Sequence, residues 1–203
     1  MKKVLITGFL PFAQYKYNPT QDMANYLHGT TLCDAEVIGV VLPCTYHEPY
    51  ETLSRIIDQE KPDVIINTGL SSSAKGVRFE TRFQNIMNGK YPDTNGYSPK
   101  NLPIVADGQS HVEIDLRNDI LLRIRDEYIP TEVSEDSEGF ICNSLGYLVA
   151  KKIQDEQLEI KHFFIHVPWT DDYKKMVKIS DDKIFLKRFD FYKTIELLVR
   201  YTA

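Results

Sequence analysis

Apolar positions in the first third of the chain alternate between short β-branched runs and longer segments with a helical repeat. This pattern predicts strand 2–8, helix 19–28, strand 35–43, helix 47–62 and strand 63–69. Pro19 suits the first turn of a helix and Gly29 suits a helix end. Strands that alternate with helices in this way are typical of a right-handed, parallel α/β sheet. Functional sites of such sheets form where the carboxyl ends of the strands meet loops.

The rest of the chain has more turn residues and fewer clear repeats. It predicts a strand or hairpin arm at 77–89, a turn-rich segment at 90–110, a helix at 111–128, a loop at 130–136, a helix from about Cys142, a strand at 159–169 and a helix at 181–202. A loop as long as 90–110 is usually functional, an interface or mobile. We see no internal repeat, low-complexity tract or linker, so we predict one α/β domain over residues 1–203.

Composition narrows the possible classes of function. The 203 residues are 42% hydrophobic and 26% charged, as in an ordinary globular protein. The net charge of −5 gives no electrostatic reason to expect nucleic acid or an anionic membrane as a partner. The apolar start is interrupted at Gly8 and Pro11, and no later run is long enough for a membrane span. Three cysteines cannot all pair with one another, so we expect free thiols and a cytoplasmic protein.

The segment 138–152 is a loop that turns into a helix, with Cys142 on the first turn. Apolar residues then recur at helical spacing, at Leu145, Leu148, Val149 and Ile153. Unpaired backbone N–H groups at a helix start favour an anion, so a cysteine there tends towards thiolate. We hypothesise that Cys142 is a catalytic nucleophile. The alternative is a small buried hydrophobe that begins the apolar stripe.

A nucleophilic cysteine commonly requires a base, and a base is often oriented by a third group. The strand at 159–169 places His162, Phe164 and His166 on one face, with His166 at the strand end. His166 could serve as the base, and Glu80 could orient it. The alternatives are a surface or hydrogen-bonded histidine, and a solvated Glu80 carboxylate paired with Arg78 or Arg82.

Two other kinds of site are disfavoured by the sequence. GLSSSAKG at 69–76 nearly matches a phosphate-binding loop, but Ala74 replaces the final glycine and Gly76 replaces the Mg²⁺-binding hydroxyl residue. His162 and His166 share a face, but no further Cys or His has the usual spacing of zinc ligands. We read the acidic residues near 171–182 as solvated turns. We therefore expect neither a metal nor another cofactor.

Several short motifs in register point to a family. The anchors are TGFLPF (7–12), Asn18-Pro19, Leu42-Pro43, KPDVIINTG (61–69), Glu80 with Asn85-Ile86, YPDTNG (91–96), FICN (140–143) and FIHVPW (164–169). With them the chain resembles the pyroglutamyl peptidases, also called pyrrolidone-carboxylate peptidases, from about Lys3 to Trp169. These cysteine peptidases remove an N-terminal 5-oxoproline. The resemblance implies that Cys142 is the nucleophile, His166 the base and Glu80 its partner.

The resemblance also implies a fold, an assembly and a substrate. The fold would be a three-layer α/β/α sandwich with a central, largely parallel twisted sheet, and the assembly a homo-oligomer, a tetramer or dimer, without cofactor. The substrate would be an N-terminally blocked peptide. Phe9, Phe12 and Phe140 would line the 5-oxoproline ring, with Asn18 near it. Lys90 falls where the family has an arginine that helps to hold developing negative charge, and lysine lacks the planar fork of arginine.

Other departures lie around the expected substrate. The family's glutamine and arginine near the substrate are missing from residues 68–74, where Leu70 and Ser71–Ser73 could reshape the pocket. Glu135, Asp136 and Glu138 add negative charge close to Cys142, which should oppose thiolate formation. Two alternatives therefore stay open. One is a sibling thiol hydrolase with a different acyl or cyclic-amide substrate, and the other is a binding or assembly protein that keeps the fold with little catalysis.

Overall fold

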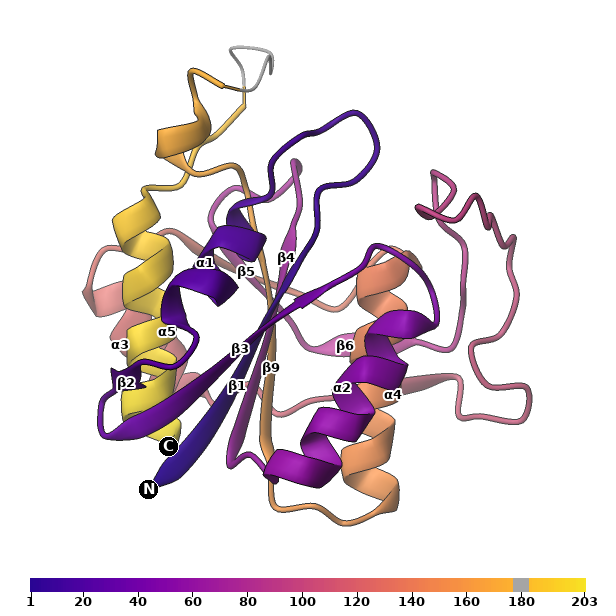
Figure 1. Cartoon of the computed structure of the whole chain (residues 1–203), viewed down its shortest axis with the longest axis horizontal. Helices are drawn as coiled ribbons and strands as arrows, with labels where there is room; N and C mark the ends of the chain where they lie inside the picture. Colours follow the sequence, from indigo (N-terminus) through magenta and orange to yellow (C-terminus); the bar gives the residue numbers. More distant parts are fainter. Residues whose placement is uncertain (177–182) are drawn as a thin grey trace.

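The computed structural model describes residues 1–176 and 183–203, and its centre is a seven-stranded sheet (Figure 1). The strands of this sheet are β1 (Lys2–Phe9), β2 (Thr31–Leu32), β3 (Ala35–Leu42), β4 (Val64–Leu70), β5 (Val77–Glu80), β8 (Thr131–Ser134) and β9 (Lys161–Val167). Their order is β2-β3-β1-β4-β9-β5-β8. Two further strands, β6 (Arg82–Gln84) and β7 (His111–Glu113), form a separate antiparallel pair.

Strand directions are mostly parallel. β3, β1, β4 and β9 run side by side in one direction, so their carboxyl ends meet at one edge. The short β2 is antiparallel to β3, and β5 is antiparallel to β9. β8 runs parallel to β5 at the other side of the sheet. The predicted largely parallel sheet is confirmed.

Helices cover both faces of the sheet, and Figure 1 shows the resulting three layers. On one face lie α1 (Pro19–Leu27), α3 (Asn118–Asp126) and α5 (Arg188–Thr202), whose apolar residues join one buried cluster with Val4, Ile66 and Phe163. On the other face lie α2 (Glu48–Glu60) and α4 (Ile141–Asp155), which pack on a second cluster that contains Leu5 and Phe164. A single 3₁₀ turn, η1, spans Asp171–Tyr173.

Local chemistry explains where the first helix begins. The Asn18 side-chain oxygen accepts the backbone N–H of Thr20 at 3.1 Å, which satisfies one of the free donors of the first turn of α1. Pro19 follows as the first helical residue. Met23, Ala24 and Leu27 are buried on the side that faces the sheet. The predicted helix at 19–28 is confirmed.

The prediction was partly wrong in the middle of the chain. Residues 111–128 were expected to be one helix, but they form β7, a short irregular connection and then α3. Val112 explains the difference, because it is 2% exposed and pairs with Phe83 of β6 within the second cluster. The expected loop at 130–136 contains β8, which pairs with β5.

The ends of the other elements differ from the prediction by small amounts. The arm at 77–89 divides into β5 and β6, and the last helix begins at Arg188 rather than near 181. Residues 181 and 182 lie outside the described residues. The first of the predicted residues of that helix and the last of the predicted acidic turns are therefore not described. None of the described helices has the length and apolar character needed to cross a lipid bilayer.

Candidate active site

Cys142 is the second residue of α4 and is partly exposed. Phe140 precedes the helix in an extended conformation, and no side chain among the described residues caps it. The first helical hydrogen bond is donated by Ser144 N–H to Phe140 O at 3.1 Å. The N–H groups of residues 141–143 therefore have no helical acceptor and lie at the positive end of the helix dipole, next to the thiol.

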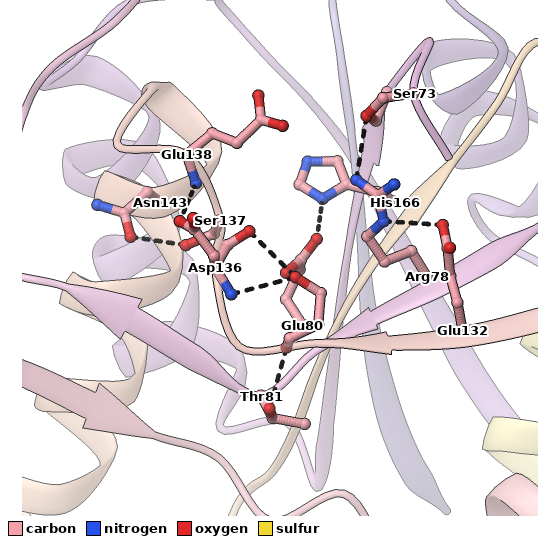
Figure 2. A network of polar contacts seen from close by, with 12 residues as sticks. Ser73, Arg78, Glu80, Thr81, Glu132, Asp136, Ser137, Glu138, Asn143 and His166 are labelled. Atoms are coloured by element: carbon pink, nitrogen blue, oxygen red, sulfur yellow. Dashed lines mark hydrogen bonds and ion pairs between the residues drawn. The ribbon is translucent and has the colours of Figure 1, made fainter. Parts of the chain in front are cut away.

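His166 and Glu80 form a buried pair, shown in Figure 2. Their side chains are joined by a 2.8 Å hydrogen bond between His166 Nδ1 and Glu80 Oε1. His166 is 7% exposed and Glu80 is 1% exposed. Burial by itself would lower the pKa of His166, but the Cys142 thiolate and the Glu80 carboxylate raise it to about 10. The carboxylate accepts the Nδ1 proton, which leaves Nε2 as the ring atom free for chemistry.

Gly69 shows how closely Cys142 and His166 approach each other. A Cβ atom at Gly69 would lie 2.9 Å from His166 Nε2 and 3.0 Å from Cys142 Sγ. The thiol and the imidazole thus face the same point, beside the end of β4. Gly69 also pairs directly with His166 in the sheet. Only a residue without a side chain leaves room for both groups at this position.

The alternative partners of Glu80 are engaged elsewhere. Arg78 Nε donates to Glu132 Oε1 at 2.8 Å. Arg82 forms ion pairs with Glu113 at 2.7 Å and with Glu135 at 3.1 Å. Glu80 is therefore not the solvated carboxylate that the sequence left as an alternative, and its Oε2 has no partner among the described residues.

Two neighbouring cavities lie at the site, and Cys142 lines the smaller one. The smaller holds about 90 Å³ and is lined by Cys142, His166 and Glu80, together with Ser137. The larger holds about 510 Å³. Both are lined by Leu70, Ser71, Glu138 and Phe140, so they lie next to each other.

The larger cavity has an aromatic wall and a charged rim. The rings of Phe12 and Phe140 lie 6.5 Å apart, and Tyr15 packs edge-on against Trp169 at 5.1 Å. Lys90, Lys100 and Glu138 add charge, and Ser71, Ser72, Ser73 and Asn88 add polar groups. Such a space suits a small, mostly apolar group that needs a few directional hydrogen bonds.

Four of the predicted binding residues line this larger cavity: Phe12, Leu70, Lys90 and Phe140. Phe9 and Asn18 line neither cavity. Phe9 is 3% exposed in the core cluster on which Phe12 and Phe140 pack, because it shares a strand face with Leu5. Asn18 is 1% exposed and uses its side chain to cap α1 and to donate to Leu10 O at 3.3 Å. Neither residue is therefore placed to contact a ligand in these cavities.

The acidic segment before the cysteine is held in a tight turn. The Asp136 carboxylate accepts the N–H of Glu138 at 3.0 Å, and both Glu138 and Gly139 have positive φ angles, of 63° and 69°. The Glu135 carboxylate is paired with Arg82. Of the three acidic residues that the sequence placed near Cys142, only Asp136 and Glu138 line the smaller cavity.

Sequence reasoning did not assign roles to several residues of this region. Gly69 marks a strand end, which is a weak signal by itself, and Ser137 has no recognisable signal in the sequence. Asn143 lies directly after Cys142 and is fully buried, with hydrogen bonds to two other segments. Across residues 1–176 and 183–203, no group of three or more His, Cys, Asp or Glu side chains gathers in a way that could hold a metal ion.

Comparisons with known proteins give a consistent result. A family model described as pyroglutamyl peptidase matches residues 2–181. The pyrrolidone-carboxylate peptidase of Thermococcus litoralis is 34% identical over 176 residues, which cover 85% of this chain and 79% of that protein. A Bacillus cereus protein of the same name is 31% identical over 170 residues, which cover 83% of this chain and 79% of that protein.

Solved structures agree with the sequence relatives. The pyrrolidone carboxyl peptidase from Thermococcus litoralis matches with a TM-score of 0.92 at 31% identity, covering 100% of this chain and 93% of that chain. Bacillus amyloliquefaciens pyroglutamyl peptidase I matches with a TM-score of 0.90 at 25% identity, covering 100% of this chain and 97% of that chain. Because the family model spans most of the chain and relatives above 30% identity cover more than four fifths of it, this chain belongs to the pyroglutamyl peptidase family.

Proposed function

We propose that this protein is a cysteine exopeptidase that removes an N-terminal 5-oxoprolyl residue from peptides. The observation that carries the proposal is the buried Glu80–His166 pair, whose imidazole faces the same point as the Cys142 thiol. Both side chains line the smaller cavity, which shares Leu70, Ser71, Glu138 and Phe140 with an aromatic cavity of about 510 Å³. A nucleophile, a base and an orienting carboxylate are thereby placed beside a pocket for a small cyclic acyl group.

The first chemical step would form a thioester. The Cys142 thiol gives its proton to His166 and attacks the 5-oxoprolyl carbonyl carbon as a thiolate. The tetrahedral intermediate collapses when His166 Nε2–H gives its proton to the leaving amine, and the C–N bond breaks. Glu80 keeps the ring in position by accepting Nδ1–H throughout.

The second step would release the product. Neutral His166 takes a proton from water at Nε2, and the resulting hydroxide attacks the thioester carbonyl. The C–S bond breaks to give 5-oxoproline and the Cys142 thiolate, with the proton retained by His166. The protein then returns to its starting state.

The start of α4 would stabilise the oxyanion that forms in both steps. The Cys142 N–H has no helical acceptor and is adjacent to the attacking sulfur, as an oxyanion donor requires. Lys90 lines the same cavity as Phe12 and Phe140 and would add positive charge there. The Phe12 and Phe140 rings would contact the uncharged 5-oxoproline ring.

One experiment tests the proposal directly. The protein and its Cys142→Ser variant are incubated with 5-oxoprolyl-aminocoumarin under reducing conditions, and fluorescence release is followed. We expect release by the parent protein and none above background by the variant. Absence of Cys142-dependent release would overturn the proposal.

Leu70 and Ser71–Ser73 favour one alternative, a sibling thiol hydrolase with a changed acyl group, because all four residues line the larger cavity. A panel of other acyl-aminocoumarins separates this alternative from the leading one. The further alternative, a binding or assembly protein, predicts no release from any member of the panel. We also propose a homo-oligomer, a tetramer or dimer, in the cytoplasm, where the three free cysteines would stay reduced.

A further inference from the structure

The side chain of Asn143 is fully buried and uses its entire hydrogen-bonding capacity. Its Oδ1 accepts Gln84 N–H at 2.8 Å and the Ser137 hydroxyl at 2.7 Å. Its Nδ2 donates to Gln84 O at 2.8 Å and to Ile86 O at 2.9 Å. Because one neighbour is a backbone N–H and two are carbonyls, only this orientation of the amide satisfies all four contacts.

These four bonds join three parts of the chain. Asn143 belongs to the first turn of α4, Ser137 belongs to the loop before it, and Gln84 and Ile86 belong to the segment that ends at Lys90. Figure 2 shows the Ser137–Asn143 contact beside the Glu80–His166 pair. Asn143 is therefore the point where the nucleophile's helix is attached to the cavity wall.

Further contacts join the segment after β6 to the loop and helix around Cys142. Asn88 N–H donates to Gly139 O at 2.8 Å. A Cβ atom at Gly89 would lie 2.4 Å from the Phe140 ring, so these two residues are in close contact. On the helix side, a Cβ atom at Gly146 would lie 2.2 Å from the ring of Phe83. Residues 84–89 thus contact the segment 137–143 at several points along it.

We propose that Asn143, supported by Ser137, is a positioning residue that fixes the cavity wall relative to Cys142. The inference rests on the proposed function, because it concerns how the acyl pocket is held against the nucleophile. Asn143 does not touch the reacting atoms. It sets where Asn88, Lys90 and Phe140 lie relative to the thiol, and a shift of about 1 Å in such an arrangement costs on the order of a hundredfold in rate.

This role predicts a difference between two reactions of the same thiol. Turnover of a 5-oxoprolyl substrate requires the cavity wall to hold the acyl group at the correct position relative to the Cys142 sulfur. Alkylation of Cys142 by iodoacetamide needs only the thiolate. Loosening the Asn143 network should therefore slow turnover much more than alkylation.

Ser137→Ala is the main test, because Asn143→Ala removes all four hydrogen bonds of a fully buried amide and is prone to unfold. Ser137→Thr restores the hydroxyl at this position, which lines the smaller cavity. Ser144→Ala is the matched control, since Ser144 is also buried near the start of α4 but its hydroxyl has no partner among the described residues. The melting temperature of each variant is measured first, to show that it is folded.

We expect Ser137→Ala to lower kcat/KM for 5-oxoprolyl-aminocoumarin by roughly threefold to tenfold and the rate of Cys142 alkylation by less than about twofold. Ser137→Thr should recover most of the activity, and Ser144→Ala should match the parent. Unchanged kcat/KM in folded Ser137→Ala would overturn the proposal. An equal fall in alkylation would also overturn it, because the network would then act on the thiol itself.

A second readout does not depend on the substrate. Hydrogen exchange of the Asn88 amide, which is bonded to Gly139 O, should be faster in Ser137→Ala than in Ser144→Ala. If the parent protein releases no aminocoumarin, the proposed function fails while the exchange measurement still decides the positioning role. Equal exchange in the two variants would overturn that role whatever the substrate.

Discussion

Glu80 is hydrogen-bonded to His166 at 2.8 Å, although its direct partner in the sheet is Phe164. Phe164 and His166 are two residues apart on β9, so their side chains lie on the same face of the sheet. Because Glu80 pairs with Phe164, its side chain lies on that face too, and its carboxylate reaches the neighbouring His166. In this arrangement the short strand β5 places the Glu80 carboxylate beside His166 from within the sheet. The carboxylate is therefore almost fully shielded from water, at 1% exposure.

Removing the charge of Glu80 should change the pH dependence of turnover. Burial opposes the charged form of His166, but the Cys142 thiolate and Glu80 raise its pKa to about 10, so the parent should lose kcat/KM only as the pH rises through about 10. Glu80→Gln removes one of the raising causes, so the basic limb should move to lower pH. At pH 7 kcat should also fall by at least about a hundredfold, because the ring loses its orienting partner.

The matched control for Glu80→Gln is Glu132→Gln. Glu132 lies on the neighbouring strand β8 and pairs with Arg78 rather than with the histidine. The pH–rate profile of Glu132→Gln should keep the basic limb of the parent. A basic limb at the same pH in both variants would contradict a role for the Glu80 charge.

Gly69→Ala should abolish turnover with a smaller effect on folding. The new methyl would lie 2.8 Å from His166 Cδ2 and 3.0 Å from Cys142 Sγ, so at least one of the two side chains must move. We expect kcat/KM to fall by more than about a hundredfold and the free energy of unfolding to fall by about 1–3 kcal/mol. Gly96→Ala is the control, because its Cβ position is open and only its φ of +82° is unfavourable. Gly96→Ala should lose some stability and keep kcat, and a fully active Gly69→Ala would contradict the close approach.

His162 should make the protein sensitive to mild acid. Its Nε2 lies 2.8 Å from Asn67 Oδ1, and burial lowers its pKa to about 3. Between pH 6.5 and about 3 the unfolded chain binds a proton at this residue and the folded protein does not, so stability is full above pH 6.5 and is lost as the pH falls. His162→Gln keeps a donor for Asn67 and cannot titrate.

Urea unfolding at pH 7 and pH 5 measures this effect. Between these two pH values, the parent should lose about 2 kcal/mol more of its unfolding free energy than His162→Gln does. The difference between the two proteins removes the contributions of other titrating groups. An equal loss in both would show that His162 becomes protonated without unfolding.

Lys90 should contribute to turnover through its charge. Lys90→Met removes a cation from the lining of the larger cavity, and we expect kcat/KM to fall by about tenfold. Lys90→Arg keeps the charge and adds a planar fork of donors, so its activity should equal or exceed that of the parent. Lys75→Met is the control, since Lys75 is exposed and lines neither cavity. If Lys90→Met and Lys75→Met have equal activity, the Lys90 charge is not used.

Much of the fold could be predicted from local patterns. The β-branched runs that became β1, β3 and β4 lie in the middle of the sheet, and the helical repeats between them became α1 and α2. The pattern failed at 111–128, because three residues paired with β6 before the helix could begin. It also missed β8, whose residues are at most partly buried and carry no apolar alternation. Pairing with a distant strand decides such short segments, and local propensity does not contain that information.

The sequence indicated candidate residues for the site more readily than the contacts between them. Cys142 was a candidate because it lies at a helix start, and the strand pattern placed His166 at the end of β9, where the structure has it. The sequence could not show that β5 is antiparallel, so the residue pattern left the Glu80–His166 contact as one of two possibilities and the resemblance favoured it. The places of Phe9 and Asn18 depend on which atoms point into the cavity, and spacing along the chain does not determine this. The hydrogen bonds of Asn143 could not be predicted from the sequence for the same reason.

The place of β9 has a consequence for the newly synthesised chain. Among the described residues β9 is the last strand along the chain, yet it lies between β4 and β5 in the middle of the sheet. Glu80 and Cys142 therefore leave the ribosome before His166, which follows Glu80 by 86 residues. Until β9 inserts, the sheet is divided and the cysteine has no base beside it. Peptidase chemistry that needs His166 can begin only after β9 has been made and has inserted, so a chain that ends before His166 would not cleave peptides.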